Sequence, residues 1–155
     1  MMFFQDGEFP KLAHYLRSRI IGMNKNSKVF KALVECIGSE KIAKQAIDPG
    51  TYPRLIIEPL IRGMVSPSGI YQGECDPAKK NYVYIHTRIG EGFETDESAR
   101  QYPTVFETTL LHEVVHWGRF IGGKPGEING KEAGNWFNHR AYGHIYVYHS
   151  DLICR

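Results

Sequence analysis

The stretch from residue 103 to residue 122, PTVFETTLLHEVVHWGRFIG, constrains this chain more than any other part of it. It contains an H-E-x-x-H motif made by His112, Glu113 and His116. On an α-helix, residues at this spacing share one face about one turn apart, so the two imidazoles could bind one Zn²⁺. Glu113 would then lie close enough to act on a water held by the metal. The motif predicts a metal-binding helix; two stacked histidines without a metal are the alternative.

Local signals predict a helix over residues 104–121. Pro103 would end the preceding segment, Thr104 would be the N-cap, and Glu107 would complete a T-x-x-E capping box. Apolar side chains recur at spacings of three and four and predict a buried stripe along this helix. The stripe consists of Phe106, Leu110, Val114 and Trp117. Glycines at 122–123 would stop the helix.

Composition limits the class of protein. The chain has 155 residues, which suits a single domain over residues 1–155. A hydrophobic content of 42% and a charged content of 23% are typical of a globular protein. A net charge of +2 gives no reason to expect nucleic-acid binding, and no apolar run approaches a membrane span. The opening residues are too few and too acidic for a secretory signal peptide. The cysteines have no paired spacing, which indicates separate thiols, with one bridge and one leftover thiol as the alternative.

Helices are predicted for the first part of the chain, about residues 10–47. Apolar residues at helical spacing predict a helix over residues 10–23. Ser27 is predicted to cap a second helix, over residues 27–37, and Ser39 to start a short third one. This part is therefore expected to be helical throughout, up to a turn that precedes the sheet.

The second part, about residues 52–155, is predicted to hold a small mixed sheet and the motif helix. Its β-prone runs are residues 54–58, 69–73 and 82–89. By analogy with zinc peptidases, the strand over residues 82–89 would bind the substrate backbone as an added strand. A short helix is predicted over residues 129–141, and the aromatic run at 144–148 is a strand or the end of a helix. This order predicts an α+β, zincin-like fold with the motif helix beneath the sheet.

A catalytic zinc usually has three protein ligands, so a third must accompany His112 and His116. The metzincin extension of the motif fails, because Gly122 stands at the sixth position after the second histidine. A glutamate on a following helix, as in the thermolysin-like arrangement, leaves Glu127 and Glu132. We favour Glu132, since it lies in the short helix predicted for this region and Glu127 lies in a Gly/Pro loop.

Further polar residues follow the motif and are candidates for metal or substrate contacts. Arg140, Tyr142 and His144 could each bind the substrate or a developing oxyanion. His139 and His149 are other possible metal donors. For each histidine, ordinary packing or exposure is the alternative.

Three separated blocks resemble one family. They are LLHEVVHWG at 110–118, EAGNWF at 132–137 and AYG at 141–143. In this order they resemble the zincin-like metallopeptidase toxin domains, which carry an L-H-E-x-x-H-[aromatic]-G helix, an E-x-G-x-x-F-E segment and a Tyr-Gly pair. Asn138 departs from the family pattern, which often has glutamate there. Glu132 matches the earlier glutamate of the segment.

The resemblance implies a zinc-dependent peptidase that acts as a secreted bacterial toxin or effector. Such domains end polymorphic toxins and type VI secretion effectors, often with an immunity protein, so we expect delivery into a target cell and a cognate immunity protein. In the expected reaction zinc activates a water, and Glu113 takes its proton as general base and delivers it to the leaving amine. The substrate would be a protein or a peptidoglycan peptide stem. Alternatives are a zinc-binding interaction module without catalysis, a housekeeping or cell-wall metallopeptidase, and an accidental motif.

Overall fold

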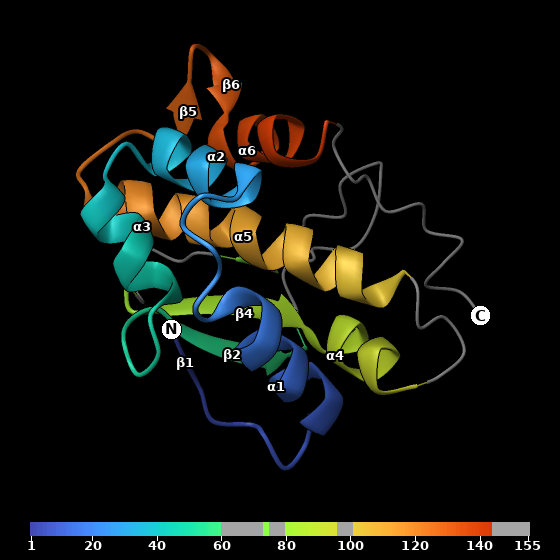
Figure 1. Cartoon of the computed structure of the whole chain (residues 1–155). Helices are drawn as coiled ribbons and strands as arrows, with labels where there is room; N and C mark the ends of the chain where they lie inside the picture. The colour runs from blue at the N-terminus through green and yellow to red at the C-terminus, as the bar shows by residue number, and fades with distance from the viewer. Residues whose placement is uncertain (60–72, 75–79, 96–100, 144–155) are drawn as a thin grey trace.

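The computed structural model describes residues 1–59, 73–74, 80–95 and 101–143 (Figure 1). Within these ranges the chain is a mixture of helices and sheet, as an α+β fold requires. Most of the expected strand at 69–73 and the aromatic run at 144–148 lie outside the described residues. None of the helices in the described ranges is long and apolar enough to cross a membrane.

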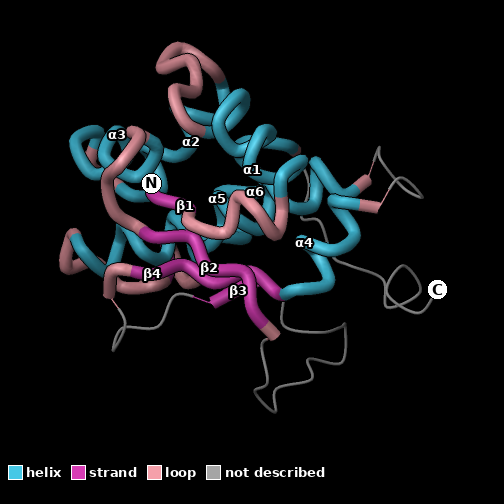
Figure 2. Tube along the Cα trace, turned by 90° about the horizontal axis from the view of Figure 1, so that it is seen from below, coloured by secondary structure: helices cyan, strands magenta, loops and turns pink. Residues whose placement is uncertain are grey.

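The larger sheet is small and mixed, which confirms the prediction. Its strands are β1 (Met2–Phe3), β2 (Arg54–Glu58), β3 (Gly73–Glu74) and β4 (Tyr82–His86). They lie in the order β1-β2-β4-β3, with β1, β2 and β4 parallel and β3 antiparallel to β4. Figure 2 shows these strands together on one side of the molecule with the helices packed behind them. β4 is paired with β2 along its length, and its residues Tyr84 and Ile85 are also paired with β3. The expectation that this strand receives a substrate strand is therefore wrong at these two residues.

The first strand was not expected, because two residues are too few to give an alternating pattern. The side-chain amide of Gln5 continues its pairing with β2. The backbone N–H of Ile57 donates to Gln5 Oε1 over 2.7 Å, and Gln5 Nε2 donates to the Ile57 carbonyl over 3.0 Å. The start of the chain is therefore held to the sheet by one side chain as well as by the backbone.

The predicted strand over residues 82–89 is wrong after His86, where helix α4 (Thr87–Glu94) begins. His86 caps this helix, since its Nδ1 accepts from the Arg88 backbone N–H over 3.1 Å. Phe93 then packs edge-on against Tyr15 and Phe106, with ring centroids 5.3 and 5.8 Å away. Capping and aromatic burial outweigh the β propensity of this segment.

The N-terminal helices follow the prediction closely. They are α1 (Pro10–Tyr15), continued by the π-helix η1 (Leu16–Ile20), then α2 (Lys28–Ile37) and α3 (Glu40–Ile47). The Ser27 hydroxyl accepts from the Phe30 N–H, and the Ser39 hydroxyl accepts from the Ile42 N–H. Both predicted caps are confirmed, while the first helix ends at Ile20 and not at residue 23.

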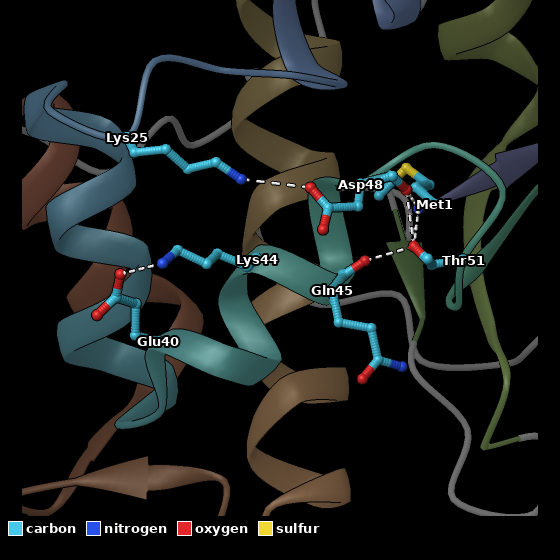
Figure 3. A network of polar contacts seen from close by, with 7 residues as sticks. All are labelled: Met1, Lys25, Glu40, Lys44, Gln45, Asp48 and Thr51. Carbon is cyan, nitrogen blue, oxygen red and sulfur yellow. Dashed lines mark hydrogen bonds and ion pairs between the residues drawn. The ribbon is translucent and has the colours of Figure 1, made fainter.

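A polar network joins the end of α3 to β1 (Figure 3). The Thr51 hydroxyl donates to the Gln45 carbonyl over 2.5 Å and accepts from the Met1 amino group over 2.7 Å. The Met1 amino group also donates to the Asp48 carbonyl, and Lys25 pairs with the Asp48 carboxylate over 3.3 Å. The helical layer is thus tied to the edge of the sheet.

Helix α5 (Tyr102–Ile121) is the longest element described, and it lies between the sheet and helices α2 and α6 (Figure 1). The predicted stripe is confirmed: each of its members is at most 1% exposed. Trp117 also donates its indole N–H to the Lys80 carbonyl over 2.9 Å, next to the start of β4. Burial on nearly all sides makes α5 the fixed centre of the core.

The predicted start of this helix is wrong. It begins at Tyr102, after Gln101, which makes no side-chain cap, and Pro103 lies in the first turn. Glu107 is not part of a capping box. Its two carboxylate oxygens accept from the hydroxyls of Tyr15 and Tyr142, over 2.7 and 2.8 Å. The Glu107 carboxylate therefore joins three helices.

The predicted end of the helix is confirmed, because Gly122 is its C-cap and Gly123 follows with a positive φ.

A small hairpin precedes the last helix. It consists of β5 (Glu127–Ile128) and β6 (Lys131–Glu132), and α6 (Ala133–Tyr142) follows at once. Asn129 and Gly130 form the turn with φ values of 53° and 73°. Asn-Gly is the dipeptide that favours such tight hairpin turns. The prediction of a helix from residue 129 is therefore wrong for its first four residues, and Glu132 ends a strand.

Candidate metal centre

Helix α5 brings two imidazoles together. The rings of His112 and His116 lie on one face of it, with centroids 5.1 Å apart and planes at 54°. Helix α6 packs against α5, and Glu132 at its start faces the two histidines. One ligand atom from each of the three residues lies within 4.8 Å of the others. The structure therefore brings together the three side chains that the sequence analysis favoured as metal ligands.

The donor atoms lie close enough to share a divalent ion. Glu132 Oε1 lies 3.6 Å from His112 Nε2 and is hydrogen-bonded to His116 Nε2, a contact that a bound ion would replace. Two ligand atoms about 2.1 Å from a tetrahedral zinc lie roughly 3.4 Å from each other. Two imidazole nitrogens and one carboxylate oxygen are also a common donor set for catalytic zinc. The residues present fit the metal.

Glu132 has a second role as the N-cap of α6. Its Oε1 accepts from the Gly134 N–H over 2.7 Å, and its Oε2 accepts from the Asn135 N–H over 2.6 Å. Burial would raise the pKa of this carboxyl, but the hydrogen bond to His116, the charges of both histidines and the Asn135 amide lower it to about 2. Glu132 is therefore a carboxylate at neutral pH, held at the positive end of a helix.

The two histidines differ in their affinity for a proton. Burial lowers the pKa of His112 to about 4. For His116, burial also lowers the pKa, but the hydrogen bond to Glu132 and the charge of Glu113 outweigh it and raise the pKa above its usual value. His112 thus offers a free nitrogen lone pair at neutral pH, as a metal ligand must.

Two glycines lie close to the imidazoles. A Cβ on Gly134 would fall 2.4 Å from Cγ of His112, so the backbone of α6 lies directly against this ring. A Cβ on Gly126 would be 3.9 Å from Nδ1 of His116. The sequence interpretation did not assign Gly134 a role, although the glycine of the E-x-G pattern was the available signal.

Glu113 lies beside the ligand cluster. It is buried, with 8% of its surface exposed, and its Oε1 is 3.9 Å from His112 Nε2. Because it follows His112 on α5, its carboxylate is carried by the same rigid helix as the two imidazoles. This is the place in which an H-E-x-x-H base is expected.

The other candidates from the sequence are placed elsewhere or are engaged. Glu127 is exposed on β5, and His139 is exposed on α6. Arg140 is exposed and makes an ion pair with Glu35 of α2 over 2.8 Å. None of these belongs to the cluster of donor atoms found among the described residues.

Tyr142 ends α6 and donates its hydroxyl to Glu107, so part of its hydrogen-bonding capacity is used inside the protein. His144 and His149 lie outside the described residues. The expected substrate contacts of Arg140, Tyr142 and His144 therefore stay predictions.

A fold that gathers the two histidines of an H-E-x-x-H motif and a glutamate from a following helix has the donor set of a metallopeptidase. Comparison with protein families bears this out. The model of the family Metallopeptidase toxin 3 matches residues 5–143, and the chain belongs to this family. The resemblance drawn from the motif blocks is therefore confirmed, and it extends over the N-terminal helices as well. Comparison with curated proteins and with solved structures gives no match.

Proposed function

We propose that this chain is a zinc-dependent peptidase with a zincin-like fold, in which His112, His116 and Glu132 bind the metal. The observation that carries the proposal is the meeting of three donor atoms from α5 and the start of α6 within 4.8 Å. Zinc is the metal that two imidazoles and one carboxylate suit best when a fourth position is left for water. Membership of a metallopeptidase toxin family supports a peptide bond as the target.

A zinc held by His112, His116 and Glu132 would lower the pKa of a water and polarise the carbonyl of the substrate. Glu113 takes the proton from this water as its oxygen adds to the carbonyl carbon. When the C–N bond breaks, Glu113 returns the proton to the leaving amine. Burial of Glu113 next to His112 supports this assignment, because a base must lie close to the water that it activates.

The proposal has three further parts. The substrate is a protein, a dedicated secretion system delivers the chain into a target cell, and a cognate immunity protein restrains it. The toxin family supports a protein substrate and secretion to a target cell. The dedicated secretion system and the immunity protein rest on the resemblance drawn from the motif blocks. A peptidoglycan peptide stem is the second substrate class, since the same hydrolysis would cut it. Growth of a heterologous bacterium that makes the chain in the cytoplasm or in the periplasm separates the two. Arrest confined to the periplasm favours the peptide stem.

Metal analysis and mutation test the core of the proposal. Purified wild-type protein should contain about one zinc per chain. His112→Ala and His116→Ala should lose it, while Glu113→Gln should keep the metal and lose peptidase activity and toxicity. Glu127→Gln is the matched control, because this exposed glutamate was the other candidate ligand and should keep both.

Each failure has its own meaning. Unchanged metal content in both histidine variants would show that the site is misassigned. Activity in Glu113→Gln would remove Glu113 as the base. Wild-type protein that binds zinc and cuts nothing would favour a binding module without catalysis.

A further inference from the structure

We propose that Arg119 is a positioning residue of the metal centre, whose guanidinium fixes the hairpin that presents Glu132 to the two histidines. The inference rests on the proposed zinc site. Arg119 lies in the last turn of α5, three residues after His116. Only 7% of its surface is exposed, which is unusual for an arginine and indicates a specific task inside the protein.

All three hydrogen bonds described for this guanidinium go to backbone carbonyls. Nε donates to Pro125 over 2.6 Å, Nη2 donates to Glu127 over 2.8 Å, and Nη1 donates to Cys36 over 2.6 Å. Within the described residues, no carboxylate makes an ion pair with Arg119 (the pairs found there involve other residues). A buried cation satisfied by carbonyls fixes the course of the backbone that carries them.

The carbonyls of Pro125 and Glu127 lie on either side of Gly126, and Gly126 connects the segment held by Arg119 to the segment that carries Glu132. Between them, the Gly126 carbonyl accepts from the Ala133 N–H over 2.9 Å. Glu127 itself pairs with Glu132 in the register of the hairpin. Fixing residues 125–127 therefore fixes residues 132–133, and with them the direction of the Glu132 carboxylate.

The third hydrogen bond, from Arg119 to the Cys36 carbonyl, anchors the guanidinium to a helix of the core. The Cys36 carbonyl belongs to the last turn of α2, where a positive charge is favourable. Helix α2 packs against both α5 and α6. Arg119 thus joins the helix that carries both histidines, a helix of the core and the hairpin that carries the third ligand. The connection from α5 to this hairpin contains three glycines, at 122, 123 and 126, and has little stiffness of its own.

Lysine could not replace this arrangement. Its ammonium is a single point of charge, whereas the guanidinium fork reaches three separate carbonyls at fixed angles. Arg119→Lys keeps the charge and loses the fork, and Arg119→Met loses both. Lys124→Met is a matched control. Lys124 lies in the same connection and donates to the Gly38 carbonyl at the end of α2 over 2.9 Å, but no hydrogen bond described for it reaches the hairpin.

The experiment measures zinc affinity by competition with a chromophoric chelator. Arg119→Met should bind zinc 10- to 100-fold more weakly than wild type, as variants that disturb the support of a ligand usually do. Arg119→Lys should fall between them, and Lys124→Met should stay within about twofold of wild type. The visible spectrum of the Co²⁺-loaded protein should change in the Arg119 variants only, because displacement of Glu132 alters the coordination of the ion. A merely structural role would not change this spectrum.

Circular dichroism of the metal-free proteins shows whether each variant is folded. If Arg119→Met does not fold, Arg119→Lys decides the matter. Folded Arg119 variants with the zinc affinity and Co²⁺ spectrum of wild type would overturn the role of Arg119 and leave the zinc site standing. Wild-type protein that binds no zinc would overturn the site itself and this inference with it.

Discussion

Replacing Gly134 with alanine should damage the metal centre more than it damages the fold. The new methyl group would lie 2.4 Å from Cγ of His112 and 2.5 Å from Cδ2 and Nδ1. Unbonded carbon atoms pack about 3.5–4.0 Å apart, so the ring must retreat by roughly 1 Å. Cγ is the ring atom joined to the Cβ, so turning the ring about the Cβ–Cγ bond does not relieve the contact, and the whole side chain must move. A metal site accepts deviations of only about 0.2 Å from ideal metal–ligand distances, so this movement of His112 should weaken metal binding.

The two effects of this substitution differ in size. Overpacking usually costs about 1–3 kcal/mol of the free energy of unfolding, and alanine returns about 1 kcal/mol because it favours helix more than glycine does. The metal-free protein should therefore lose no more than about 2 kcal/mol. Zinc affinity should fall at least 10- to 100-fold, the range seen when the support of a ligand is disturbed.

Zinc affinity by chelator competition and thermal unfolding of the metal-free protein measure the two effects separately. Gly90→Ala is the control. Its methyl group would lie 2.8 Å from Phe9 and 2.9 Å from Ile57, in a part of the core made by other elements. It should lower the unfolding temperature and leave zinc affinity unchanged. Gly134→Ala with wild-type zinc affinity, or an equal loss of affinity in Gly90→Ala, would refute the reasoning.

Three further predictions concern the protonation of the histidines, the hydrogen bond between Tyr142 and Glu107, and removal of the metal. In an NMR titration of the metal-free protein, His112 should titrate near pH 4 and His116 above its usual value. Stability should fall on account of His112 from pH 6.5 toward 4, where the unfolded chain binds a proton that the folded chain does not; equal pKa values would contradict this. Tyr142→Phe should lose about 1–2 kcal/mol in urea unfolding, because Glu107 loses one hydrogen bond, and unchanged stability would count against that contact. A chelator should lower Tm, since a ligand at about 1,000 times its Kd adds roughly 4 kcal/mol, and an unaffected Tm would speak against a bound metal.

The motif helix was predictable because its signals are local. Apolar spacing and the terminal glycines act within a few residues, and both are confirmed. The structure differs in where the first turn begins and in the absence of the capping box, because Glu107 accepts from Tyr15 and Tyr142. The position of Glu132 at the end of a hairpin was harder to predict from the sequence. Strands of two residues give no alternation, so the Asn-Gly turn before it was interpreted as the start of a helix.

Helix α4 and the contacts of Arg119 depend on residues that are distant in the sequence. The segment 87–94 begins with β-prone residues and contains two glycines, which disfavour helix in isolation. It is helical because Phe93 packs against rings from α1 and α5. Arg119 donates to the backbone carbonyl of Cys36, far earlier in the chain, and no local sequence pattern predicts such a contact.

The capping role of Glu132 bears on the order of events in the life of the protein. Its carboxylate accepts from two backbone amides and touches His116, so its charge is already compensated without a metal. Domains whose ligands are satisfied only by the metal unfold when it is removed. Here the chain can fold first and acquire its ion afterwards. Synthesis of the chain and loading of the proposed metal are thereby separable in time, and the metal-free chain would be folded but inactive in the proposed reaction.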